Sequence, residues 1–88
     1  MPVISMFYGI IIYMFAEKNK QHNKPHIHAE YQDKEAVLAF DGEILAGEIP
    51  SKQLKMIIGW MAIHEDELQA DWKLLSEGKE YFKIEPLK

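Results

Sequence analysis

The sequence has no cysteine and no arginine, so all ten of its basic residues are lysine. Without cysteine, disulfide bonds and thiolate metal sites are excluded, and a reducing compartment is the default expectation. Without arginine, the chain lacks the side chain that usually grips phosphate with two hydrogen bonds. The net charge of −4 at pH 7 also argues against a general nucleic-acid binder, because such proteins usually carry a basic surface.

Targeting and membrane signals are also missing from the apolar beginning of the chain, MPVISMFYGIIIYMF. This stretch has neither a basic start nor a small-residue cleavage site. It is shorter than the roughly 20 apolar residues that span a bilayer. We therefore expect a cytoplasmic protein with no membrane contact.

Length and composition predict one globular domain over residues 1–88. The chain is 48% hydrophobic and 27% charged, as ordinary folded domains are. Neither an internal repeat nor a low-complexity tract divides it. A chain this short buries a modest core, so oligomerisation or a partner would add to its stability.

Short apolar stretches separated by turn signals predict a small, mostly antiparallel β-sheet. The clearest is HIHAEY at residues 26–31, in which apolar and polar residues alternate so that each kind occupies one face. Asp41-Gly42 is a hairpin signal, and Gly9 marks a turn or a bulge. In chain order, the expected strands cover residues 3–15 (one strand or a pair), 26–31, 35–40 and 43–49, with a turn at 32–34.

The C-terminal half predicts one long α-helix from Ser51, a good N-cap, to about Glu77, with Gly78 as the stop signal. Such a helix is roughly 38 Å long. A final short strand is expected at residues 81–87. The predicted fold is therefore α+β, a small sheet packed against one long C-terminal helix. Apolar residues recur at helical spacing at Leu54, Ile58, Met61, Leu68, Trp72 and Leu75.

Part of this helix, residues 56–63, is apolar nearly all round, which predicts burial on more than one side. Because one small sheet covers a single side, we expect a homodimer through helix 52–77, or a partner protein, on the other. Trp60 and Trp72 are expected in the core. His64 is expected in a flanking position beside them.

Three of the four histidines, His22, His26 and His28, fall within seven residues. Because alternate residues of a strand share a face, His26 and His28 point together, with Glu30 on the same face. With His22 reaching across the loop, they form a nitrogen and oxygen ligand set suited to Zn, Ni or Mn. One hypothesis for the cluster is therefore a metal site of His22, His26 and His28.

Two other interpretations of the cluster stay open. Histidine is the best acid–base residue near neutral pH, and cleavage of a phosphodiester needs one acid and one base. His26 and His28 would supply them, and Lys24 would direct positive charge toward a phosphate. The remaining interpretation is a polar outer face of a hairpin that carries no chemistry.

The chain resembles a small bacterial family, domain of unknown function 4160, in four features. These are the stretch HNKPHIHAEY, the apolar start, the segment KEAVLAFDGEILAGEIP and the two tryptophans around HEDEL. The family motif typically runs H-N-P-P-H-x-H-x-E, and Lys24 replaces the first of its two prolines. The resemblance implies a candidate toxin. Its gene would lie beside that of a second small protein, of the domain of unknown function 2442 family, which would be its antitoxin-like partner.

The residues and the resemblance together predict a toxin-like component of a two-gene toxin–antitoxin pair, acting on RNA. His26 and His28 would be the acid–base pair, His22 and Lys24 would assist, and Glu30 would orient an imidazole. The alternative is a non-catalytic regulatory module that binds a metal or a partner protein through the same cluster.

Overall fold

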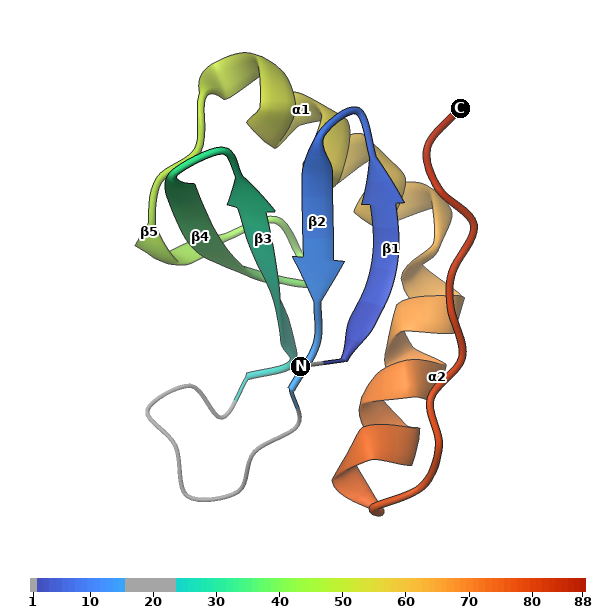
Figure 1. Cartoon of the computed structure of the whole chain (residues 1–88). Helices are drawn as coiled ribbons and strands as arrows, with labels where there is room; N and C mark the ends of the chain where they lie inside the picture. The colour runs from blue at the N-terminus through green and yellow to red at the C-terminus, as the bar shows by residue number, and fades with distance from the viewer. Residues whose placement is uncertain (1, 16–23) are drawn as a thin grey trace.

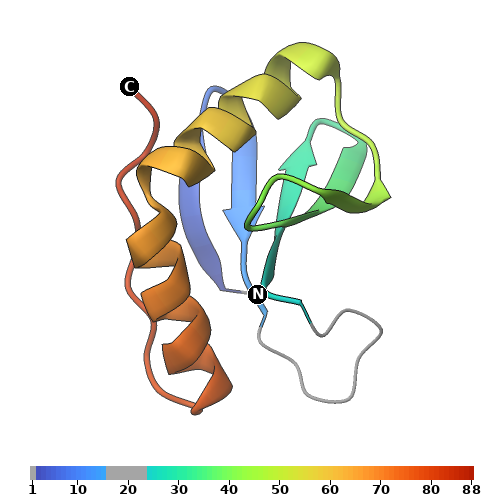
Figure 2. The same ribbon diagram turned by 180° about the vertical axis from the view of Figure 1, so that it is seen from behind.

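The computed structural model describes residues 2–15 and 24–88, in which the chain forms five strands and two helices. The elements are β1 (Val3–Phe7), β2 (Ile10–Tyr13), β3 (His26–Tyr31), β4 (Lys34–Ala39), β5 (Ile44–Gly47), α1 (Ser51–Ile63) and α2 (Glu65–Ser76). The strands form one antiparallel sheet in chain order. Helix α1 crosses one face of this sheet, and α2 continues beside β1 (Figures 1 and 2). The predicted α+β class and antiparallel sheet are confirmed.

Tight turns connect successive strands and set their register. Tyr8 and Gly9 both have positive φ, 49° and 79°, as two-residue hairpin turns of type I′ require. The apolar stretch at 3–15 is therefore a strand pair broken at Gly9, one of the two predicted forms. Gln32, with φ 55°, turns β3 into β4. Gly42, with φ 95°, lies between β4 and β5, as its hairpin signal predicted.

The core lies between one face of the sheet and α1. Trp60 of α1 is fully buried, and its ring packs 5.3 Å from that of Phe7. Both tryptophans were predicted in the core. Trp60 lies there, whereas Trp72 is only partly buried against it. The fully or almost fully buried side chains of the sheet and helices include Ile10, Ile12, Ile27, Ala29, Ala36, Leu38, Ile57, Met61 and Leu68.

The prediction of one long helix is wrong, because the helical path breaks at His64. His64 has φ −110° and ψ 27°, and it both ends α1 and begins α2. Three acidic residues follow in the first turn of α2, where the positive end of a new helix dipole favours them. The bend keeps Leu68 in the same core as Trp60. A straight helix would overrun a sheet whose strands have four to six residues.

The helix ends match the sequence signals only in part. Pro50, not Ser51, is the N-cap of α1, and Ser51 is the first helical residue. At the other end Gly78 does stop α2, with φ 70°. The Gly78 N–H donates to the Leu75 carbonyl and the Lys79 N–H to the Leu74 carbonyl, which is a Schellman motif.

The predicted short strand at 81–87 is also wrong, since no described residue after Ser76 lies in a strand. The segment after the Gly78 stop, residues 80–88, which we call the tail, instead makes three separate hydrogen bonds to the rest of the structure. Ile84 N–H donates to the Ile4 carbonyl of β1 at 2.8 Å. The indole N–H of Trp60 donates to the Glu85 carbonyl at 2.8 Å, and Phe82 N–H donates to Asp71 Oδ1 at 3.0 Å. One bond to β1 is too few to make a strand ladder.

Among the described residues, neither helix combines the length and the hydropathy needed to cross a membrane.

Asp71 generates a prediction about pH. It is fully buried, and Oδ2 accepts no hydrogen bond within the described structure. Burial raises the pKa of Asp71, against the lowering effect of the Phe82 N–H, and the charge of Glu67 raises it further. A raised folded-state pKa means that stability is lost as pH rises from the unfolded-state pKa through the folded one. We expect Asp71→Asn to raise Tm more at about pH 7.5 than at about pH 4.

The matched control for this measurement is Asp41→Asn. Asp41 is exposed, and the hydrogen bond from Lys24 lowers its pKa, so its substitution has the opposite and smaller pH trend. A Tm difference for Asp71→Asn that does not change with pH would contradict the buried-charge explanation.

Gly47 generates a second prediction. It has φ 74°, and a Cβ at this position would lie 2.2 Å from the Glu35 carbonyl oxygen of β4. We expect Gly47→Ala to destabilise the protein by more than about 2 kcal/mol in urea unfolding, from strain and clash together. Gly78→Ala is the control, since Gly78 has φ 70° but open space around it. Equal losses in the two variants would exclude a role for the clash.

Candidate functional site

His26, the first residue of β3, has a fixed orientation at one end of the sheet. Its side chain is nearly buried, and Nδ1 lies 2.7 Å from the Lys24 carbonyl oxygen. Because a carbonyl only accepts, His26 Nδ1 carries the proton and donates it in this bond. In the neutral ring the lone pair is therefore on Nε2, and Nε2 is the nitrogen of this tautomer that can accept a proton or ligate a metal.

His26 belongs to a chain of aromatic rings that connects the sheet to α2. Its ring centroid is 5.3 Å from that of His28 and 5.2 Å from that of Trp72. Beyond these, His28 is 4.9 Å from Phe15, and Trp72 is 6.0 Å from Phe40. All four contacts are edge-to-face, the arrangement that aromatic pairs prefer. The structure therefore brings the predicted pair His26 and His28 together, and it adds Trp72 and Phe40 as supporting rings.

His28 lies beside a carboxylate that sequence analysis did not identify. Its Nδ1 is 3.9 Å from Glu35 Oε1 of β4, a distance that suits a bridging water or an ion pair with a protonated ring. Glu35 is directly opposite Glu30 in the β3–β4 register. Glu30 shares the strand face of His28, as predicted. Glu35 joins this face through cross-strand pairing, so the register of the hairpin was the signal that could have identified it.

The side chain of Lys24 is held by the loop between β4 and β5. Its Nζ donates to Asp41 Oδ2 and to Glu43 Oε1, both at 2.9 Å. The hydrogen bond to Glu43, and then the one to Asp41, raise the pKa of Lys24. The ammonium is therefore already matched by two carboxylates. A phosphate would compete with both of them for this charge.

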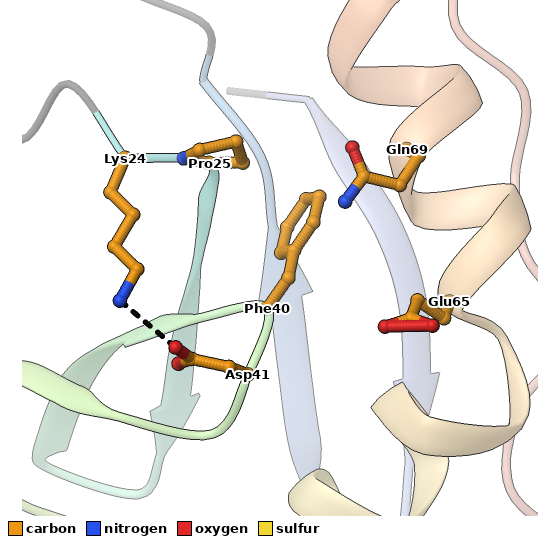
Figure 3. A pocket seen from close by; sticks show the side chains of 6 residues that line it. All are labelled: Lys24, Pro25, Phe40, Asp41, Glu65 and Gln69. Atoms are coloured by element: carbon orange, nitrogen blue, oxygen red, sulfur yellow. Dashed lines mark hydrogen bonds and ion pairs between the residues drawn. The ribbon is translucent and has the colours of Figure 1, made fainter.

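A pocket of about 220 Å³ lies between the chain before β3, the residues after β4 and the start of α2. Figure 3 shows the Phe40 ring in its middle, with Lys24 and Pro25 on one side and Gln69 on the other. Phe40 also contacts Trp72, which packs on His26, so the pocket borders the aromatic cluster. Its lining is Lys24, Pro25, Phe40, Asp41, Glu65 and Gln69.

The metal hypothesis had His22, His26 and His28 as ligands. His22 lies outside the described residues. Within residues 2–15 and 24–88, no three His, Asp or Glu side chains are arranged as a metal-binding group. What the structure does provide is two neighbouring imidazoles, one of them oriented by a carbonyl, as metal-binding histidines commonly are.

The fourth histidine, His64, has a separate environment at the helix break. Its Nδ1–H donates to Glu67 Oε1 at 2.6 Å, and its ring lies 5.6 Å from that of Trp60. This agrees with the flanking position that was expected for it.

The tautomer of His26 is directly measurable. Because Nδ1 donates to the Lys24 carbonyl, we expect the neutral ring to be the Nδ1–H form, which is the less common one in free histidine. A long-range ¹H–¹⁵N spectrum assigns the protonated nitrogen, and His26→Gln identifies the signal. An Nε2–H form at His26 would contradict the geometry of the site. His64, whose Nδ1 also donates, provides an internal comparison.

The comparisons with known proteins give one match. A family model described as "Domain of unknown function (DUF4160)" matches residues 9–73. No curated protein and no solved structure matches the chain. The matched region runs from the β1–β2 turn into α2, so it contains His26, His28, Glu35 and Trp72. Since the match covers most of the sequence, the chain belongs to the family of domain of unknown function 4160.

Proposed function

We propose that the protein is the toxin-like component of a two-gene toxin–antitoxin pair in the cytoplasm, acting on RNA through its histidine cluster. The observation that carries the proposal is the pair His26 and His28, whose ring centroids are 5.3 Å apart. One imidazole has its Nδ1–H committed to a backbone carbonyl, and the other is partly exposed. Two adjacent imidazoles are what phosphodiester cleavage needs for an acid and a base.

In the proposed reaction, a ribose 2′-hydroxyl attacks the adjacent phosphorus. One imidazole takes the hydroxyl proton, and the other gives a proton to the departing 5′-oxygen, so a cyclic phosphate and a free 5′-hydroxyl result. His26 would exchange its proton through Nε2, because Nδ1 is occupied. Glu35, whose Oε1 lies 3.9 Å from His28 Nδ1, would orient His28 in the role first expected of Glu30. His22 keeps its predicted assisting role.

Lys24 has a more limited role in this proposal than the sequence suggested. Its carbonyl orients His26, which makes it a positioning residue through the backbone. Its ammonium is bound to Asp41 and Glu43, so it would reach a phosphate only after leaving both.

A second candidate function is a non-catalytic regulatory module that binds Zn, Ni or Mn, or an antitoxin-like partner protein, through the cluster. The observation that favours it is the Lys24 carbonyl at His26 Nδ1. With Nδ1 donating to this carbonyl, Nε2 would be the ligating nitrogen of His26, beside the second imidazole of His28.

The test is bacterial growth after induction of the gene, with purified protein assayed on total RNA. We expect the wild type to arrest growth and to cleave RNA. His26→Gln/His28→Gln is expected to abolish arrest and to lower cleavage at least about 100-fold, because acid–base catalysis is lost. His64→Gln is the matched control, the same change at a histidine outside the cluster, and it is expected to retain both activities.

Circular dichroism checks that the double variant is folded. Arrest and RNA cleavage by a folded double variant would exclude the cluster as the catalytic site. A wild type that neither arrests growth nor cleaves RNA would contradict the toxin proposal. Stoichiometric metal in the wild type, absent from the double variant, would then support the regulatory module.

A further inference from the structure

The pocket beside Phe40 is lined by groups that the proposed reaction leaves unused. Its volume is about 220 Å³. This is below the roughly 300–1,000 Å³ of sites that hold drug-sized molecules, so it suits one small group rather than a whole nucleotide. Figure 3 shows the Glu65 carboxylate and the Gln69 amide extending from α2 toward the Phe40 ring. The pocket therefore combines an aromatic ring with polar groups from a neighbouring helix.

Glu65 and Gln69 are available to bind a ligand. They are four residues apart on α2, so their side chains are neighbours on one face of the helix. Both are exposed, and neither side chain forms a hydrogen bond or ion pair within the described part of the chain. The other carboxylate of the lining, Asp41, already accepts from Lys24 through Oδ2 and from the Glu43 N–H through Oδ1. Glu65 is thus the carboxylate whose two oxygens are open to a ligand.

A carboxylate beside an amide matches the Watson–Crick edge of guanine. That edge carries two adjacent donors, N1–H and N2–H, next to the acceptor O6. The two oxygens of Glu65 would accept from the donors, and the Gln69 amide would donate to O6. Adenine and cytosine each have one amino donor on this edge, so one Glu65 oxygen would stay unpaired. Uracil has two carbonyl oxygens there, which a carboxylate repels.

Phe40 supplies a surface on which a base would stack. Its ring is partly buried and lines the pocket. Proteins commonly hold the unpaired bases of single-stranded RNA on aromatic side chains. The Phe40 N–H donates to the Pro25 carbonyl at 3.3 Å, and Pro25 directly precedes His26. The pocket is therefore attached to the strand end that carries the proposed acid–base pair.

We propose that this pocket is a base subsite, which binds a guanine next to the phosphate that is cleaved. The proposal rests on the proposed action on RNA and names the base that the same site selects. A base is the uncharged part of a nucleotide, so it approaches Glu65 without the repulsion that a phosphate meets. A basic side chain of a partner protein is the competing occupant, because a guanidinium also presents paired N–H donors. The contacts that link Phe40 through Trp72 to His26 favour the base.

Titration of the full chain with guanosine, followed in ¹H–¹⁵N spectra, tests binding of the base alone. We expect the Gln69 side-chain NH₂ and the Phe40 backbone N–H to shift, with a dissociation constant of about 0.1–5 mM, because one base makes few contacts. Inosine differs from guanosine only in lacking the N2 amino group, so it should bind at least about fivefold more weakly. Inosine that binds as tightly as guanosine would overturn the proposal. This comparison uses the wild type, so it does not depend on the folding of any variant.

Glu65→Gln tests the carboxylate. It should weaken guanosine binding at least about tenfold, because a charged acceptor is lost. Asp66→Asn is the matched control, since Asp66 is also an acidic residue in the first turn of α2 but does not line the pocket. It removes the same favourable interaction with the helix end and should leave guanosine binding unchanged. Equal effects of the two substitutions would overturn the assignment.

Two further measurements examine the two sides of the proposed contact. Phe40→Leu should weaken guanosine binding roughly tenfold, because it removes the stacking surface. N-acetyl-arginine amide is the probe for the basic side chain of a partner protein. If it shifts the same signals at lower concentrations than guanosine does, the base subsite is excluded, and the pocket belongs to a protein-binding site.

The cleavage pattern on total RNA separates this proposal from the proposed function. We expect the wild type to cut mainly next to guanine, and Glu65→Gln to lower cleavage there more than next to other bases. Cleavage without base preference, together with no guanosine binding, would overturn the base subsite and leave the proposed function standing. Guanosine binding with the expected inosine difference, but without cleavage, would support the base subsite and contradict the proposed function.

Discussion

The burial of Trp60 is the interaction on which the remaining arrangement depends. Its ring packs against Phe7 of β1, and its indole N–H donates to the Glu85 carbonyl of the tail. The imidazole of His64, at the helix break, lies 5.6 Å from the same ring. A fully buried tryptophan contributes several kcal/mol, on the order of 3–5, relative to alanine. One side chain therefore joins the sheet, the first helix, the break and the tail.

The candidate site depends on this arrangement because three separate parts of the chain build it. His26 and His28 come from β3, Phe40 follows β4, and Trp72 comes from α2. Trp72 contacts His26 only because the chain bends after α1. Without the bend at His64, α2 would continue past the sheet, and His26 would lose its contact with the Trp72 ring.

Local signals in the sequence were enough to predict the strands and turns. They did not predict the contacts between distant segments. The alternation in HIHAEY and the signals at Gly9 and Asp41-Gly42 depend on neighbouring residues only. The break at His64 was missed because apolar periodicity continues through it, although the acidic run after it is typical of a helix start. Glu35 and Trp72 reach the histidines through strand register and helix direction, which composition and spacing do not encode. The tail at 81–87 looks like a strand but forms one bond to β1.

The charges around the cluster bear on which chemistry it can support. Lys24 is matched by Asp41 and Glu43, while Glu30 and Glu35 lie opposite each other beside His28. These carboxylates repel a polyanion such as RNA and attract a divalent cation. A cation held by the imidazoles would supply the positive charge that the absence of arginine leaves missing. If the proposed metal and the proposed phosphodiester substrate both bound here, the cation would offset the repulsion between the carboxylates and the phosphate.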